Sequence, residues 1–83
     1  MSIQRFGEKL KILRKAHHVT LKQMAEYLGY TTHSYLSELE SGQKVPTTQF
    51  VLNVARLFHV TTDELLKDEL DVDLENSYIE ATK

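Results

Sequence analysis

The chain has 83 residues, which is enough for one domain but not for two. It contains no cysteine, and this excludes a disulfide framework, a thiol nucleophile and a cysteine-based zinc site. No stretch approaches the roughly 18 consecutive apolar residues that a membrane span requires, and the first residues do not begin a secretory signal. We therefore expect a cytoplasmic protein with no membrane partner.

The formal net charge of −2 conceals two regions of opposite sign. Residues 1–62 contain eight Lys or Arg and four Glu, whereas residues 63–83 contain two Lys and eight Asp or Glu. A mildly basic body followed by an acidic end does not exclude a nucleic-acid partner. We expect one folded domain over residues 1–68 and an acidic tail over residues 69–83.

Two amphipathic helices are predicted in the first third of the chain. The first spans about Ser2 to His17, because its apolar side chains recur every three or four positions. The second follows Thr20, which stands three residues before Gln23 in the spacing of a capping box, and it ends at Gly29. The two apolar stripes are Ile3, Phe6, Leu10 and Leu13, and then Leu21, Met24, Ala25 and Leu28.

Three further helices are predicted before residue 69, which makes the fold class all-α, a compact five-helix bundle. A short helix over residues 33–41 closes at Gly42, and the helix after it has the broadest apolar face in the chain. Candidate N-caps of the last two helices are Thr47 or Thr48, and Thr61 or Thr62. The inward residues are Leu36 and Leu39, then Phe50, Val51, Val54, Ala55, Leu57 and Phe58, then Leu65 and Leu66.

The acidic end of the chain fits two kinds of secondary structure. Leu70, Val72 and Leu74 alternate with acidic residues as in a strand, while apolar residues from Leu66 to Tyr78 also recur every four positions as in a helix. The sequence does not decide between them. For its role we consider a disordered, solvated tail or a dimerisation arm.

The segment from Thr20 to Gly42 has the organisation of a helix-turn-helix: a helix of two turns, a glycine-containing turn and a second short helix. Ala25 is small where the two helices must approach each other. Leu36 and Leu39 anchor the second helix to the core, so its opposite face is free to enter a groove of nucleic acid.

These residues resemble the Cro/repressor-type helix-turn-helix proteins, the Xre family, over about residues 6–66. The matching stretches, in family order, are residues 6–15 (FGEKLKILRK), 24–29 (MAEYLG), 34–42 (SYLSELESG), 46–47 with 50–52, and 60–66 (VTTDELL). The resemblance implies a transcriptional repressor that binds double-stranded DNA as a homodimer. Its operator would be pseudo-palindromic, with half-sites about one helical turn apart.

The resemblance also assigns roles by position. Base-reading candidates are Thr32, His33, Ser34, Ser37 and Glu38. Candidates for contacts to the DNA backbone are Lys22, Thr31, Tyr35, Gln43, Lys44 and Thr48. Arg14 and Glu40 are expected to form a structural pair between the first and third helices.

Three departures from the family pattern affect which DNA is bound. Leu21 stands where the family often has Gln, and the turn from Gly29 to Ser34 is one residue longer than usual. The outer face of the third helix has no Lys or Arg, and Glu38 occupies a position that is often basic or an amide.

The alternative function is a protein-interaction module, either antitoxin-like or an accessory factor with a regulatory protein partner. The acidic tail and the third helix without Lys or Arg suggest it. Neither a Gly-rich phosphate loop nor a nucleophile motif is present, and the four histidines show no metal-ligand spacing. We therefore expect no enzymatic activity, no cofactor and no metal.

Overall fold

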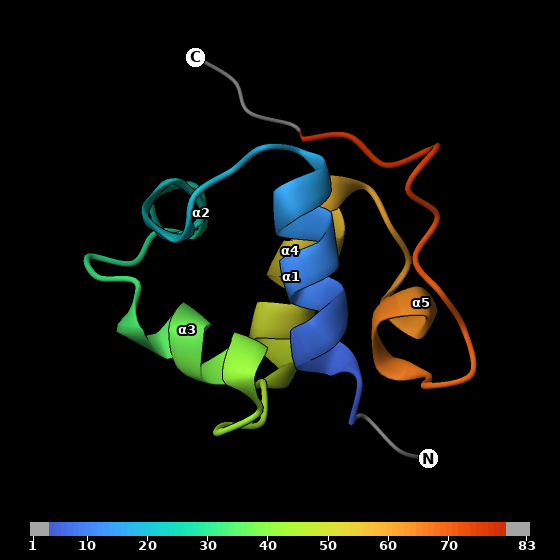
Figure 1. The fold of residues 1–83 in the computed structure, drawn as a ribbon, viewed down its shortest axis with the longest axis horizontal. Helices are drawn as coiled ribbons and strands as arrows, with labels where there is room; N and C mark the ends of the chain where they lie inside the picture. Colours follow the sequence, from blue (N-terminus) through green and yellow to red (C-terminus); the bar gives the residue numbers. More distant parts are fainter. Residues whose placement is uncertain (1–3, 80–83) are drawn as a thin grey trace.

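Five α-helices follow one another in the computed structural model, which describes residues 4–79 (Figure 1). They are α1 (Phe6–Ala16), α2 (Leu21–Leu28), α3 (Ser34–Ser41), α4 (Thr48–Phe58) and α5 (Thr62–Leu66). The described residues contain no strand, so the predicted all-α fold is confirmed. None of the helices in this range has both the length and the apolar character needed to cross a membrane.

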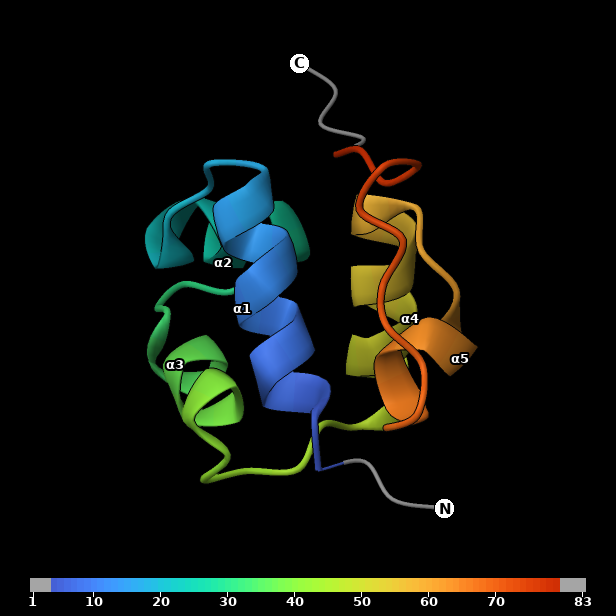
Figure 2. The same ribbon diagram turned by 45° about the vertical axis from the view of Figure 1, so that its right-hand side comes forward.

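Helices α1 and α4 occupy the middle of the molecule. The α2–α3 pair lies on one side of them and α5 lies on the other (Figures 1 and 2). Helix α1 contacts both α3 and α5, while α4 contacts α2 and α5. This arrangement places α3 at the edge of the bundle, with its outer side away from the other helices.

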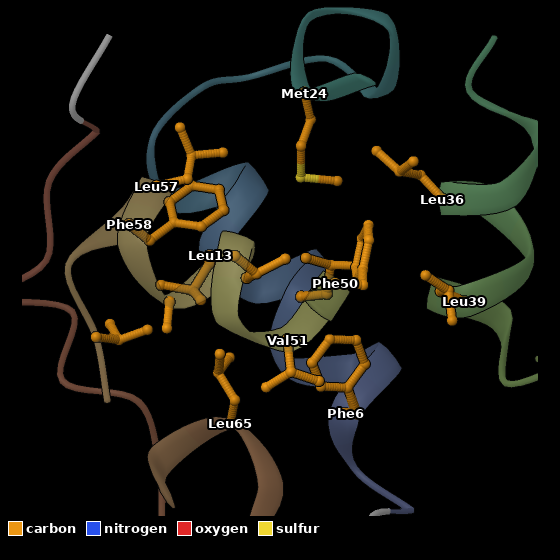
Figure 3. Packing of buried hydrophobic residues seen from close by; sticks show 14 of the residues in the cluster. Phe6, Leu13, Met24, Leu36, Leu39, Phe50, Val51, Leu57, Phe58 and Leu65 are labelled. Atoms are coloured by element: carbon orange, nitrogen blue, oxygen red, sulfur yellow. The ribbon is translucent and has the colours of Figure 1, made fainter. Parts of the chain in front are cut away.

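One continuous apolar core holds the five helices together (Figure 3). The three phenylalanines are at most 2% exposed, and the Phe6 and Phe50 rings meet edge to face with centroids 6.2 Å apart. Met24, Leu36 and Leu65 bring α2, α3 and α5 into the same core, and each is fully buried. The predicted inward faces of these helices are therefore confirmed.

Local capping chemistry sets most helix boundaries. Thr20 and Gln23 form the predicted capping box at the start of α2, and Thr61 forms a second one at the start of α5. The N-cap of α4 is Thr47, whose hydroxyl accepts from the Phe50 amide. Each arrangement satisfies amide groups that the first helical turn leaves unpaired.

A residue in the left-handed conformation follows four of the described helices, directly after α2, α3 and α4 and one residue later after α1. Gly29 and Gly42 end α2 and α3 as the sequence indicates, with φ of 89° and 85°. His18 and His59 adopt the same conformation after α1 and α4, with φ of 57° and 56°. Because this conformation costs a residue with a Cβ about 1–2 kcal/mol, it was not expected at histidine.

The predicted start of α1 near Ser2 is wrong. Ser2 and Ile3 lie outside the described residues, while Gln4 and Arg5 form a turn and the helix begins at Phe6. The Asp68 carboxylate accepts from the Gln4 and Arg5 amides at 3.3 and 3.0 Å. These contacts come from the far end of the domain, and no local pattern encodes them.

Residues 67–79 run back along the side of the molecule formed by α4 and α5, without helix or strand (Figure 2). Arg5 fixes the beginning of this segment by donating to the Asp68 carbonyl at 2.7 Å and to the Asp71 carboxylate at 2.8 Å. The hydrogen bond to the Asp71 carboxylate raises the pKa of Arg5.

The end of the same segment contacts α1 and α4. Ser77 is buried, its hydroxyl donates to the Leu74 carbonyl, and it lies 2.9 Å from His17 Nε2. Because the Ser77 proton is used in this way, His17 Nε2 must be the donor. The Tyr78 amide donates to the Phe58 carbonyl, and the Tyr78 ring stacks on His59 with centroids 3.9 Å apart.

Candidate nucleic-acid interface

Helices α2 and α3 and the turn between them form the structural unit of the site. Ala25 is 2% exposed where α2 faces the core, and Leu36 and Leu39 are buried beneath α3. With these anchors inward, the serines of α3 face solvent. They are Ser34, Ser37 and Ser41.

The five candidates for base reading lie at the start of α3 and along it. Thr32 and His33 are exposed in the turn that leads into the helix, Ser34 and Ser37 are exposed on the helix, and Glu38 is half-buried. His33 occupies the N-cap position, but its side chain makes no capping hydrogen bond. It is therefore not held against the helix as a cap.

The candidates for backbone contacts flank α3 on two sides. Lys22 and Thr31 line a hollow of about 280 Å³ in front of the turn, together with Thr32, His33 and Ser34. Gln43 and Lys44 are exposed in the loop after α3, and Thr48 is the exposed first residue of α4. The fold thus distributes these residues over four segments: α2, the turn after it, the loop after α3 and the start of α4.

Tyr35 differs from the other candidates because its ring is part of an aromatic cluster. It meets Phe50 edge to face at 5.5 Å and lies 5.6 Å from Tyr30, which itself lies 6.0 Å from Phe50. Desolvation, followed by the proximity of Tyr35, raises the pKa of Tyr30. The cluster holds the turn and the first part of α3 against the core.

Tyr30 is a part of the site for which no role was predicted. Its position directly after Gly29 is the available signal, since an apolar residue there commonly packs back onto the helix that has just ended. Its amide donates to the Ala25 carbonyl at 2.8 Å, as this type of helix end requires.

Glu38 and Lys44, assigned to different DNA contacts, form an ion pair in the free protein. Lys44 Nζ lies 3.6 Å from Glu38 Oε1, and the side chains are 55% and 38% exposed. The loop after α3 folds back so that the Gln43 and Lys44 amides both approach the Glu38 carbonyl, at 2.9 and 3.3 Å.

Arg14 and Glu40 join α1 to the end of α3 on the inner side of the site. Arg14 Nε and Nη2 donate to the two Glu40 carboxylate oxygens at 2.7 and 3.2 Å, and Nη1 donates to the Val19 carbonyl at 3.0 Å. The side chains are 13% and 7% exposed. The pair therefore fixes the orientation of α3 and is not available to a ligand.

Gly7 is a second determinant of this contact that sequence reasoning missed. A Cβ at this position would overlap the Leu39 carbonyl oxygen and lie 2.8 Å from that of Glu40. Only glycine lets α1 approach the backbone of α3 so closely. Its position inside an amphipathic helix was the available signal, because glycine is unfavourable there without a packing reason.

Among residues 4–79, no three His, Asp or Glu side chains gather in a way that could hold a metal ion. The chemistry that the site offers is that of hydroxyl, carboxylate, imidazole and ammonium groups on an exposed helix and its flanks.

Comparisons with known proteins agree with this geometry. Over 64 residues the chain is 39% identical to the HTH-type transcriptional activator BcrR of Enterococcus faecalis. The aligned region covers 77% of this chain and 31% of that protein. The chain is 36% identical over 61 residues to the uncharacterized HTH-type transcriptional regulator YobD of Bacillus subtilis (strain 168), an alignment that covers 74% of this chain and 54% of that protein. The chain thus spans about half the length of these relatives or less.

A third relative is similar in length. The chain is 31% identical over 75 residues to the ImmF control region 10 kDa protein of Bacillus phage phi105, which covers 90% of this chain and 82% of that protein. Residues 5–67 match the family described as helix-turn-helix domain, and this range encloses all five helices. The chain therefore belongs to the helix-turn-helix family and is of the Cro/Xre type.

Proposed function

We propose that this protein is a sequence-specific DNA-binding transcriptional regulator that inserts α3 into the major groove. The observation that carries the proposal is the outer side of α3, where small hydroxyl side chains are exposed while the inner side is anchored by Leu36 and Leu39. Such a helix fits the width of the major groove, about 12 Å. Relatives named as HTH-type transcriptional regulators support the proposal.

The residues divide into two functions. Thr32, His33, Ser34, Ser37 and Glu38 read base edges, since hydroxyl and imidazole groups can donate or accept and a carboxylate accepts from the cytosine N4 amino group. Lys22, Thr31, Tyr35, Gln43, Lys44 and Thr48 contact the phosphate backbone and set the position of α3. Tyr35 can do so only through its hydroxyl edge, because its ring packs on Phe50.

The regulator acts as a homodimer on a pseudo-palindromic operator, because one small module buries too little surface for regulatory specificity. The second copy docks on the side formed by α4 and α5, where Val51, Leu52 and Leu66 line an apolar hollow of about 340 Å³. In Figure 1 α5 lies on the opposite side of the molecule from α3, so a copy docked against it leaves α3 free for DNA, although Thr48 also lines the hollow. Leu52→Glu should then weaken self-association in sedimentation without unfolding the chain, whereas Glu26→Gln should not.

The regulator is a repressor, since occupancy of an operator within a promoter is enough to block transcription. Activation would need a further surface for the transcription machinery. A reporter driven by the bound promoter distinguishes the two, because expression should rise when the protein is removed.

Selection of bound duplexes from a random DNA pool tests the proposed function directly. We expect enrichment of a short two-fold-related sequence, with half-sites about 10 base pairs apart. Binding that is no tighter to the enriched duplex than to a scrambled one would refute sequence-specific regulation. Absent DNA binding together with capture of a stoichiometric protein would favour the protein-interaction module instead.

A further inference from the structure

The charge on the outer side of α3 depends on one acidic residue and its partner in the following loop. Helix α3 contains two charged residues, Glu38 and Glu40. The Glu40 side chain is only 7% exposed and is paired with Arg14, so Glu38 is the charge of α3 that is accessible to a ligand. Lys44 neutralises it through an ion pair of 3.6 Å.

The Glu38–Lys44 ion pair can open at little cost in stability. Both side chains are more than one-third exposed, and an ion pair in that setting contributes little to stability. The backbone contacts of the loop do not depend on it, because the Gln43 and Lys44 amides approach the Glu38 carbonyl and not its carboxylate. Lys44 can therefore turn away without a change in the loop that carries it.

We propose that the Glu38–Lys44 ion pair is a specificity element that opens only on the correct DNA sequence; this inference rests on the proposed DNA-binding function. On a site that offers a cytosine N4 amino group, Glu38 exchanges the Lys44 ammonium for that donor. Lys44 is then released to a phosphate. On other sequences a free carboxylate would face base acceptors and phosphates, so the pair stays closed and Lys44 makes no phosphate contact.

The exchange has a measurable signature in the salt dependence of binding. Each phosphate contacted by a cation contributes a slope of about −0.9 to log K against log salt. The opened pair adds one such contact on the selected sequence and none on unrelated DNA. Removing the carboxylate frees Lys44 on every sequence, whereas removing the ammonium matters only where the pair is open.

The test uses the full chain, a duplex enriched from a random pool and a scrambled duplex of the same composition, with affinities measured over a series of NaCl concentrations. Glu38→Gln should steepen the slope on the scrambled duplex by about 0.9 and leave that on the selected duplex unchanged. Lys44→Gln should reduce the slope on the selected duplex by the same amount and leave that on the scrambled duplex unchanged. Lys22→Gln, at a proposed phosphate contact outside the pair, is the control and should reduce both slopes equally.

A second selection provides an independent readout. With Glu38→Gln the preference for cytosine at one position of each half-site should disappear, and the affinity ratio of selected to scrambled duplex should fall roughly tenfold or more. Equal changes on both duplexes for Glu38→Gln or Lys44→Gln would overturn the exchange while leaving the proposed function intact. Failure of the wild type to enrich any sequence would instead overturn the proposed function and the exchange with it.

Discussion

Arg14 on α1 donates two hydrogen bonds, of 2.7 and 3.2 Å, to the carboxylate of Glu40 near the end of α3. The remaining guanidinium nitrogen donates to the Val19 carbonyl, so each nitrogen of this largely buried cation has a partner within the fold. The pair therefore stabilises the packing of α1 against α3, the proposed reading helix. Its removal should affect stability first and DNA binding second.

Glu40→Gln should lower the free energy of unfolding by about 3–5 kcal/mol, because it leaves the Arg14 charge buried without its counter-ion. Urea unfolding followed by circular dichroism measures this. Glu26→Gln, at an exposed position on α2, is the control and should change stability by less than about 0.5 kcal/mol. A cost for Glu40→Gln below about 1 kcal/mol would mean that the pair behaves as an exposed one.

Gly7→Ala should destabilise the protein although alanine is normally the better helix former by about 0.5–1 kcal/mol. The new methyl group would overlap the Leu39 carbonyl oxygen and crowd that of Glu40, and backbone atoms cannot rotate away as a flexible side chain can. We expect a net loss of about 1–3 kcal/mol. Lys11→Ala, exposed on the same helix, should be nearly neutral, and a stabilised Gly7→Ala protein would contradict the close approach of α1 and α3.

The structure also shows how far local sequence information reaches. Helix existence and inward faces were predictable, because periodicity and caps such as Thr20 with Gln23 act within a few residues. The start of α1 was not, because the turn that precedes it is held by Asp68, more than 60 positions away. The left-handed His18 and His59 could not be predicted either, since the local preference at such positions is for glycine.

The candidate site also has features that local sequence predicts and features that depend on distant contacts. Exposure of the serines of α3 followed from the anchoring of Leu36 and Leu39, which periodicity revealed. The contact between Glu38 and Lys44 could not be predicted from periodicity. It depends on the left-handed Gly42, which turns the loop back over the end of the helix. The path of residues 67–79 depends on contacts with distant elements that no local pattern specifies.

The buried Lys9 should make the stability of the fold depend on pH in the alkaline range. Its side chain is fully buried and donates to the Glu64 and Lys67 carbonyls, at 2.6 Å each. Desolvation, followed by the nearby charge of Arg5, lowers the pKa of Lys9 from its ordinary 10.5. In the window just below 10.5 the unfolded chain therefore holds a proton that the folded chain has lost, and the contribution of Lys9 to stability rises with pH.

Lys9→Met isolates this effect, because it keeps much of the aliphatic volume but removes both hydrogen bonds. At neutral pH it should cost about 1–3 kcal/mol for each carbonyl left without a partner. Urea unfolding of both proteins at a series of pH values should show that cost growing as the pH approaches 10.5 and levelling off above it. A cost that shrinks over the same window would contradict the lowered pKa.

The acidic end of the chain should matter more for stability than for DNA binding at physiological salt. A chain that ends at Asp71 loses the buried Ser77 beside His17 and the Tyr78 contacts with Phe58 and His59. We expect this truncation to lower the free energy of unfolding by about 1–3 kcal/mol, from the hydrogen bonds and the apolar surface that it uncovers.

The double variant Glu69→Gln with Glu75→Gln separates charge from packing, since both side chains are exposed and the segment itself remains. Residues 67–79 lie on the side of the molecule away from α3 (Figures 1 and 2), and the molecule measures 35 × 28 × 20 Å. Because the Debye length is about 8 Å at 0.15 M salt and about 30 Å at 0.01 M, the variant should bind scrambled DNA more tightly only at low salt. Anisotropy titrations at both salt concentrations test this, and an equal gain at 0.15 M would show that the acidic segment approaches the DNA-binding side.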